Sequence, residues 1–275
     1  MSEFGVLAEL VAAARVLVAA RSEREPLPAL AGRALAATPQ GGRFEAALFQ
    51  PAGLAVIAEC KRASPSRGTI AADYDPARIA VAYERAGAAA ISVLTEASRF
   101  GGSLADLAAV RAAVTTPLLR KDFIIDAYQL HEARAWGADA VLLIVAALRQ
   151  HELVALHRGA IELGLAALVE VHDECDLDRA LAAGARVIGV NNRNLRTLQV
   201  DLAASYRLAP LLPAGVIRVS ESGIRSRDDL ARLGAAGYHA VLVGERLMTA
   251  ADPGAALAAL TGRGPEFPAP TVPAP

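Results

Sequence analysis

From residue 54 onward, the chain alternates short apolar runs with longer amphipathic stretches. Eight of the runs have the length of a strand and are nearly continuous in Val, Ile, Leu and Ala, as strands buried on both faces are. They lie at residues 54–60, 89–94, 117–122, 139–144, 166–171, 187–191, 216–221 and 239–243, and each is followed by a stretch of helical periodicity. Eight parallel strands with intervening helices predict an α/β protein of the (β/α)8 TIM-barrel class.

Glycines and capping residues mark the boundaries of these units. Gly87, Gly137, Gly184 and Gly237 each precede an apolar run, at the place where a glycine that ends a helix is expected. Asp75 stands directly before a proline, which is a common start of a helix. This punctuation supports a chain of repeated strand–helix units.

The segment before the first strand has a helical pattern of its own. Apolar residues recur at helical spacing from Leu7 to Val18, and prolines at positions 26 and 28 break that helix. A weaker helix and a short amphipathic turn follow at 29–37 and 43–49. The segment is too short to form a core alone, so we expect it to pack against a larger body.

We therefore predict three parts of the chain. Residues 1–48 form an N-terminal helical extension packed on the barrel, and residues 49–262 form the (β/α)8 catalytic domain. Residues 263–275 are rich in proline and show no periodicity, so we predict a disordered tail there.

Composition narrows the classes of function. Hydrophobic residues make up 54% of the chain and charged residues 21%, so a large core is expected and global disorder is not. The net charge of −1 leaves no basic excess for nucleic acid or an anionic membrane, and we expect neither partner. No apolar run reaches membrane-spanning length and the start lacks a basic signal region, so we expect a cytoplasmic protein.

Metal and nucleotide sites are not indicated. Cys60 and Cys175 are far apart and belong to no Cys-x-x-Cys motif. The histidines have no ligand spacing, and no glycine-rich nucleotide loop follows a strand; the histidines are His131, His151, His157, His172 and His239. We therefore expect no metal and no cofactor.

Polar side chains gather where the apolar runs end. They are Glu59, Lys61, Lys121, Glu170, Asn191, Arg193, Glu221 and Ser222. Chemistry in a barrel takes place at the carboxyl ends of the strands, and strand alternation places Glu59 and Lys61 on one face. Any one of these residues could be a solvated loop charge, and Glu59 with Lys61 could be a buried ion pair. The whole set on one rim is better explained by an active site.

Small residues follow the last two predicted strands. Ser222 and Gly223 come after one strand, and Gly244 and Glu245 after the next. Glycine lets backbone N–H groups approach an anion, and these two loops are the usual phosphate cradle of the fold. Ser64 in the first loop can add a hydroxyl. Each glycine could serve only a turn, but together they favour a phosphorylated small molecule as ligand.

Several long motifs resemble those of the indole-3-glycerol-phosphate synthases, barrel enzymes of tryptophan biosynthesis. The motifs are ECKRASPSRG at 59–68, LLRKDF at 118–123, LVEVH at 168–172, IGVNNRNL at 188–195 and SESGI at 220–224. The likeness runs from about residue 5 to 260 and includes the helical extension. It implies ring closure of 1-(2-carboxyphenylamino)-1-deoxyribulose 5-phosphate to indole-3-glycerol phosphate, with loss of CO2 and water.

The resemblance also implies a role for each polar residue. Lys121 is the general acid of the condensation and Glu170 the base of the dehydration, while Lys61, held by Glu59, binds the substrate carboxylate. The lysine that acts as the second acid stays open. The other implied contacts are Asn191, Arg193, Glu221 and Ser222 for the intermediates, Phe100 and Phe123 for the aromatic ring, and Ser64, Gly223, Gly244 and the Glu245 N–H for the phosphate.

Position 245 departs from the family pattern. It is a glutamate where many relatives have a small hydroxyl residue. A carboxylate would repel a phosphate, so we expect the side chain of Glu245 to point away from it.

Two alternatives stay open from the sequence. Another phosphate-binding barrel, such as a phosphoribosyl isomerase, would not need the Glu-x-Lys pair or the N-terminal helix. A non-catalytic barrel that binds a sugar phosphate would not need Lys121 and Glu170. The resemblance names other enzymes of the tryptophan pathway as candidate partners.

Overall fold

The computed structural model describes residues 5–49, 53–65, 67–71, 73–194 and 199–262. Within them, eight parallel strands close a barrel in which each strand pairs with its neighbours in chain order and the last pairs with the first. The strands are β1 (Ala55–Cys60), β4 (Ala90–Leu94), β5 (Leu118–Lys121), β6 (Ala140–Ile144), β7 (Ala166–Val171), β8 (Val187–Asn191), β9 (Ile217–Glu221) and β10 (Ala240–Val243). The predicted (β/α)8 class is confirmed. The predicted Pro-rich tail lies outside the described residues.

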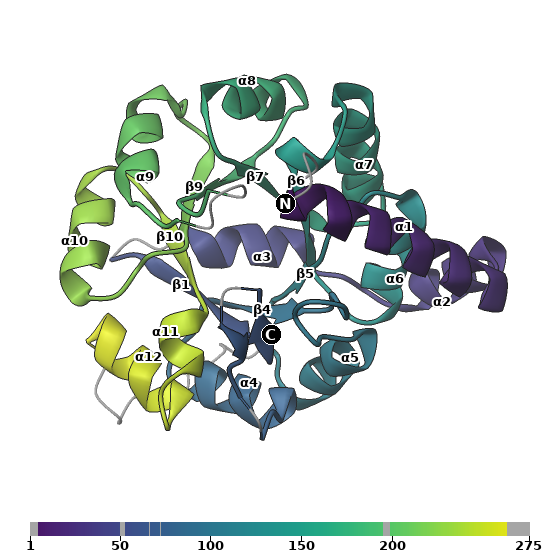
Figure 1. The fold of residues 1–275 in the computed structure, drawn as a ribbon, viewed down its shortest axis with the longest axis horizontal. Helices are drawn as coiled ribbons and strands as arrows, with labels where there is room; N and C mark the ends of the chain where they lie inside the picture. Colours follow the sequence, from purple (N-terminus) through teal and green to yellow (C-terminus); the bar gives the residue numbers. More distant parts are fainter. Residues whose placement is uncertain (1–4, 50–52, 66, 72, 195–198, 263–275) are drawn as a thin grey trace, which may run out of the picture.

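Helices follow the strands and form a ring around them (Figure 1). They are α4 (Pro76–Arg85), α5 (Leu104–Ala113), α6 (Ala127–Ala135), α7 (Gln150–Glu162), α8 (Glu174–Ala182), α9 (Ala203–Leu208), α10 (Arg227–Ala235), α11 (Glu245–Met248) and α12 (Pro253–Thr261). The loop after β1 carries a small hairpin of β2 (Ala63–Ser64) and β3 (Gly68–Thr69), and short 3-10 turns lie at Val145–Ala147 and Ala209–Leu211. None of the described helices is both long and apolar enough to cross a membrane.

Strand alternation divides the apolar side chains into two cores. Outward residues such as Val56 and Ala58 pack against the surrounding helices. Inward residues such as Ile57, Leu119 and Leu168 fill the barrel interior. Inward positions recur every second residue along a strand. The inward residue two positions after each apolar one, towards the carboxyl end of the strand, therefore faces the mouth of the barrel.

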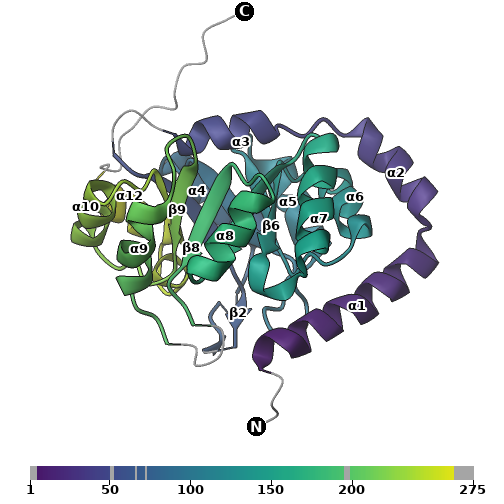
Figure 2. The ribbon, with the colours of Figure 1, turned by 90° about the horizontal axis from the view of Figure 1, so that it is seen from above.

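The chain before β1 forms α1 (Val6–Arg24), α2 (Leu27–Ala36) and α3 (Gly41–Leu48). Phe44 and Leu48 of α3 are fully buried in the interior core. Figure 2 shows α3 at one end of the barrel and β2 at the opposite end, with the start of α1 also near the β2 end. The third segment, which we expected to be a short turn, is thus a helix that closes the barrel floor.

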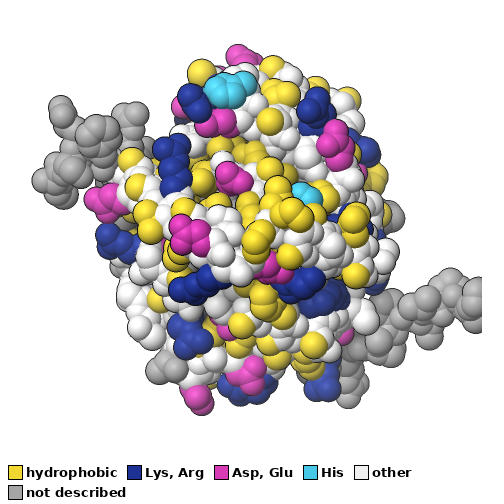
Figure 3. Space-filling view, turned by 90° about the vertical axis from the view of Figure 1, so that its right-hand side faces the viewer, with side chains coloured by type: hydrophobic (Ala, Val, Ile, Leu, Met, Phe, Trp, Pro, Cys, Tyr) yellow, Lys and Arg dark blue, Asp and Glu magenta, His cyan; other side chains and the backbone are white. Residues whose placement is uncertain are grey.

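Helix α1 and the residue after it, Glu25, are held to α6 by polar contacts. Arg21 Nε lies 2.7 Å from Glu132 Oε1, and the Tyr128 hydroxyl donates to the Glu25 carbonyl at 2.9 Å. At the other end of α1, Arg99 Nη2 reaches Glu9 Oε2 at 3.2 Å. The side of the molecule that carries these helices mixes apolar, basic and acidic side chains (Figure 3).

Candidate active site

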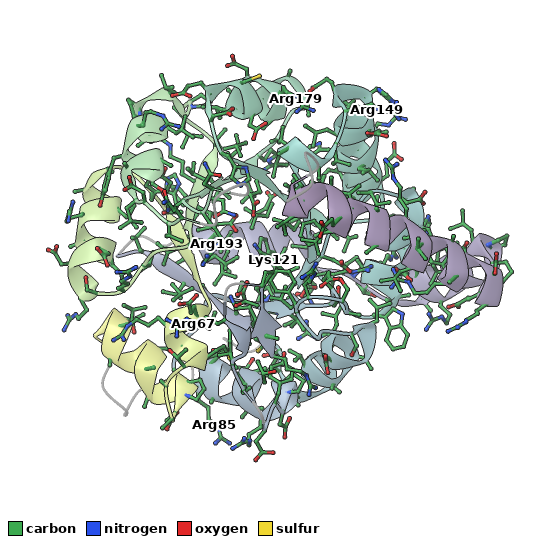
Figure 4. The ribbon with its side chains drawn as sticks, viewed as in Figure 1. Arg67, Arg85, Lys121, Arg149, Arg179 and Arg193 are labelled. Carbon is green, nitrogen blue, oxygen red and sulfur yellow. The ribbon has the colours of Figure 1, made fainter. Side chains whose placement is uncertain are left out.

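A cavity of about 410 Å³ opens at the carboxyl end of the barrel. All of the predicted site residues line it except Ser64, which is buried in β2. Figure 4 shows Lys121, Arg193 and Arg67 around the centre of the barrel, whereas Arg85, Arg149 and Arg179 lie at its periphery. The structure thus brings together residues from strands β1 to β10.

The chain contains only two lysines, Lys61 and Lys121, and both line this cavity. Every other basic side chain except histidine is an arginine. Arginine stays protonated in proteins, whereas lysine can give up its proton. Two lysines among many arginines could already have been noticed in the sequence as candidates for proton transfer. The structure places both of them at the cavity.

Glu59 and Lys61 form the first charged cluster. The Lys61 Nζ lies 2.6 Å from Glu59 Oε1, and the Glu59 side chain is 6% exposed. Burial raises the pKa of Glu59, but the ammonium groups of Lys61 and Lys121 outweigh burial and bring the pKa below its ordinary value. Glu59 is therefore ionised at neutral pH and fixes Lys61 by a charge-assisted contact.

Gly244 makes room for this carboxylate. A Cβ at position 244 would lie 2.1 Å from Glu59 Oε1, and the backbone of Gly244 has a negative φ. The glycine is therefore required here by the close approach of Glu59. This close approach is enough to explain a glycine at position 244. The phosphate contact implied by the family resemblance stays a prediction.

Lys121 on β5, Glu170 on β7 and Glu221 on β9 form the second charged cluster. The Lys121 Nζ lies 3.0 Å from Glu221 Oε2 and 3.5 Å from Glu170 Oε2. Both glutamates are almost fully buried. Gly189 on β8 leaves room for one of them, because a Cβ there would lie 2.1 Å from Glu221 Oε1.

Burial and charge act in opposite directions on the pKa values of this cluster. Burial lowers the pKa of Lys121, but the carboxylates of Glu221 and Glu170 outweigh burial and raise it well above its ordinary value. Burial raises the pKa of Glu221 to about 7, with the Lys121 ammonium acting against it and Glu170 adding to it. Oε1 of Glu221 is buried and accepts no hydrogen bond from the described residues. It is an acceptor available to a ligand hydroxyl.

Asn192 is a structural residue of the site that our sequence analysis did not single out. Its Nδ2 donates to the backbone carbonyls of Glu221 and Ser222, at 2.9 and 3.1 Å. Ser222 has φ 66°, a left-handed conformation that is unusual for a serine. The neighbouring Asn191 lines the cavity and accepts from the Arg193 N–H at 2.9 Å. Asn192 thus fixes the backbone of the loop after β9 through these two hydrogen bonds.

The side chain of Glu245 pairs with two arginines, a feature that the sequence did not predict. It lines the cavity, with Oε1 2.7 Å from Arg67 Nε and Oε2 3.6 Å from Arg193 Nη2. That it points away from a bound phosphate stays a prediction. Two arginines neutralise it, and Arg67 comes from the loop after β1, far away in sequence, so the pairing could not be inferred from the local pattern.

Phe100 and Phe123 line the cavity, as do the apolar residues Leu94 and Ile144. The loop that carries Phe100 is held by Glu96, a buried residue that we had not selected. Glu96 accepts from the backbone N–H groups of Ser98, Arg99 and Phe100 at 2.8, 2.8 and 3.1 Å. In the described part of the chain, no group of three or more His, Cys, Asp and Glu residues could hold a metal ion.

Comparisons with known proteins agree with this geometry. A family model described as indole-3-glycerol phosphate synthase matches residues 7–260. The indole-3-glycerol phosphate synthase of Mycobacteroides abscessus is 55% identical over 264 residues, which are 96% of this chain and 96% of the relative. The protein of the same name from Mycobacterium sp. (strain KMS) is 54% identical over 273 residues, or 98% and 100% of the two chains.

Distant solved structures share the fold. The thiamine phosphate pyrophosphorylase of Pyrococcus furiosus superposes with a TM-score of 0.56 at 16% identity, covering 76% of this chain and 93% of its own. A mandelate oxidase mutant superposes with a TM-score of 0.57 at 19% identity, covering 82% and 87%. At this level of identity, the likeness concerns the barrel alone.

Proposed function

The chain belongs to the indole-3-glycerol phosphate synthase family, the decarboxylating lyases of tryptophan biosynthesis, and we propose that the two lysine clusters divide its ring closure between them. Lys61 binds the carboxylate of the phosphorylated substrate, and Lys121 carries the proton transfers. The observation that carries this proposal is the position of Lys121, whose 14% exposed side chain lies at the cavity between two carboxylates at 3.0 and 3.5 Å.

The condensation needs an acid at the ketone oxygen. As the aromatic carbon attacks the ketone carbon, the C=O electron pair moves onto oxygen and takes a proton from Lys121 Nζ. The nearby glutamates hold Lys121 in its protonated form before this step, because they raise its pKa. CO2 then leaves, and the electrons of the broken C–C bond restore the aromatic ring.

The dehydration needs an acid and a base together. Glu170 takes the proton next to the reacting carbon, and one of the two lysines protonates the departing hydroxyl, which leaves as water. Two protons are supplied by lysine and one is taken by Glu170, so each turnover consumes one proton from solvent. Glu170 Oε2 lies 3.5 Å from Lys121 Nζ, a distance over which a proton can return through a small movement.

The remaining cavity residues suit the other parts of the substrate. Asn191, Glu221, Ser222 and Arg193 all line the cavity, and we assign them to hydrogen bonds that orient the intermediates. Phe100 and Phe123 offer apolar surface to the aromatic ring. Four groups stay candidates for the phosphate: Ser64, Gly223, Gly244 and the N–H of Glu245.

A fluorescence assay tests the proposal. The purified protein is incubated with 1-(2-carboxyphenylamino)-1-deoxyribulose 5-phosphate in the presence of EDTA, and indole fluorescence is followed. We expect a catalytic rise in the wild type and none with Lys121→Ala, with both proteins folded by circular dichroism. A folded wild type that binds the compound without turnover would indicate a non-catalytic barrel, and no binding would indicate a different phosphate ligand.

We also propose the wider setting of the enzyme. The net charge of −1 gives no reason to expect nucleic acid or membrane as partner, and we place the protein in the cytoplasm, with other enzymes of the tryptophan pathway as candidate partners. The division into an extension (1–48), a barrel domain (49–262) and a tail (263–275) also stays a prediction.

A further inference from the structure

His172 lies directly beside Glu170, on the side away from Lys121. The two residues are separated by one position on and just after β7, so their side chains share a face. His172 Nε2 lies 3.5 Å from Glu170 Oε1, while Glu170 Oε2 lies 3.5 Å from Lys121 Nζ. The carboxylate of Glu170 is therefore bracketed by a basic group on each oxygen.

The other ring nitrogen of His172 faces a second carboxylate. Nδ1 lies 3.5 Å from Asp176 Oδ2, and the backbone N–H of His172 donates to the same oxygen at 3.2 Å. Asp176 is itself fixed at the start of α8, where its N–H donates to Asp173 Oδ1 at 2.9 Å. The side chain of His172 is 16% exposed and does not line the cavity.

Both ring nitrogens of His172 are buried and make no hydrogen bond of ordinary length with the described residues. A buried polar atom normally has a partner, and only the imidazolium form can donate to carboxylates at both nitrogens. The geometry therefore suits a protonated ring that tightens onto both carboxylates when the site is occupied.

We propose that His172 is a positioning residue for Glu170, whose imidazolium bridges Glu170 Oε1 and Asp176 and leaves Oε2, on the Lys121 side, to take the proton of the dehydration. This inference rests on the proposed role of Glu170 as base. It adds a function for a histidine that has no ligand spacing in the sequence and no contact with the cavity.

The charges around His172 favour its protonation. Burial lowers the pKa of His172, but the carboxylates of Asp176, Glu170 and Glu221 outweigh burial and raise it above its ordinary value. Two arginines also lie nearby. Arg179 Nη1 is 3.8 Å from Asp176 Oδ1, and Arg207 Nη2 donates to the His172 carbonyl at 3.5 Å while pairing with Glu174. Lys121 lies on the far side of Glu170.

Two substitutions at position 172 separate positioning from packing. We expect His172→Ala to lower kcat by about tenfold or more with KM changed by less than about twofold, because Glu170 acts after the substrate is bound. His172→Gln should recover most of kcat, because the amide N–H can still donate to Glu170. The matched control is His157→Gln, which changes a buried histidine on α7 and should leave kcat unaltered.

The pH dependence gives a readout that packing alone would not change. As pH rises through the pKa of His172, the imidazolium is lost, so kcat of the wild type should fall in that range. In His172→Gln this fall should disappear, because glutamine does not titrate. Asp176→Asn should move the fall to lower pH, because one of the carboxylates that raise the pKa of His172 is removed.

NMR titration of the histidine ring provides a test that needs no turnover. In folded wild type, the His172 signal should titrate at higher pH than in Glu170→Gln. If Glu170→Gln leaves that titration unchanged, or if His172→Ala has wild-type kcat and pH profile, His172 does not position Glu170. The titration decides the question even if His172→Ala fails to fold.

One further outcome concerns the proposed function itself. If Glu170→Gln keeps near-normal kcat, the assignment of Glu170 as base is wrong, whatever His172 does. If Glu170→Gln is inactive and the His172 variants behave like wild type, the base stands and only the positioning role is wrong.

Discussion

The two ends of the barrel interior use the same strands for opposite purposes. Towards the floor, Ile57, Leu119, Leu168 and Val219 pack with the plug formed by α3. Two residues further along each of these strands, the inward side chain is Glu59, Lys121, Glu170 or Glu221. Because inward positions recur every second residue, an apolar layer lies directly beneath a charged layer.

This contrast shows how the enzyme tolerates so many buried charges. The apolar layer and the plug supply burial free energy, whereas the charged layer is costly unless each charge has a partner. The partners are present, since each lysine lies within 3.0 Å of a glutamate oxygen. Substitutions at the charged layer should therefore change activity, and substitutions at the floor should change stability.

The largest expected effect comes from Lys121→Arg. The variant keeps a positive charge between Glu170 and Glu221, but a guanidinium does not release its proton at neutral pH. We expect kcat to fall by about a thousandfold, within the range that general acid catalysis supplies, with the melting temperature nearly unchanged. Steady-state kinetics by indole fluorescence measures it. Retention of more than about a tenth of kcat would mean that Lys121 supplies charge and not a proton.

The same change at the other lysine sharpens the contrast. If Lys61 only binds the substrate carboxylate, Lys61→Arg keeps kcat and changes KM; if Lys61 is also the acid of the dehydration, kcat falls as well. This comparison identifies the second acid, which the sequence leaves open.

Phe44→Ala should destabilise the floor of the barrel, at the end opposite the charged residues. Phe44 is fully buried in the interior core, so the variant loses apolar burial and leaves a cavity at the floor. We expect the free energy of unfolding to fall by about 3–5 kcal/mol, with kcat per folded molecule close to wild type. Urea unfolding and activity at low temperature measure the two. Phe49→Ala is the control, because Phe49 is 61% exposed. A large fall in kcat of folded Phe44→Ala would show that the two ends are coupled.

The apolar layer was predictable from the sequence, whereas much of the charged layer was not. The predicted strand bounds agree with the structure to within about one residue. Continuous apolar runs of that length, preceded by a glycine, are typical of buried strands in an α/β chain. The inward direction of Glu59 and Lys121 followed from alternation. The pairing of Glu245 with Arg67 and the floor role of α3 depend on contacts between distant segments, which no local pattern encodes.

Gly189→Ala tests the close approach of Glu221 to the backbone of β8, which the sequence does not predict. The added Cβ would lie 2.1 Å from Glu221 Oε1 and 3.1 Å from Leu168 Cδ1, so the carboxylate must leave its position beside Gly189. We expect kcat to fall by about a hundredfold, the scale of a displacement near 1 Å in an active site. Gly32→Ala is the control, because nothing lies within 4 Å of a Cβ there and alanine favours the helix. Activity within a few fold of wild type would show that Glu221 can relax without harm to the site.

Glu245→Gln should produce the smallest effect, at the edge of the charged layer. Glu245 occupies Arg67 and Arg193, and an incoming phosphate must compete with its carboxylate for these arginines. Glutamine removes that competition, so inorganic phosphate should inhibit the variant more strongly. We expect its inhibition constant to fall by about threefold, since the side chains of Arg67 and Glu245 are 57% and 33% exposed and partly exposed pairs contribute little. Glu174→Gln, which removes the exposed pair with Arg207, should leave that constant unchanged. Weaker inhibition of Glu245→Gln by phosphate would instead show that Glu245 holds the two arginines in place for the ligand. In that case the carboxylate would help phosphate to bind and would not compete with it.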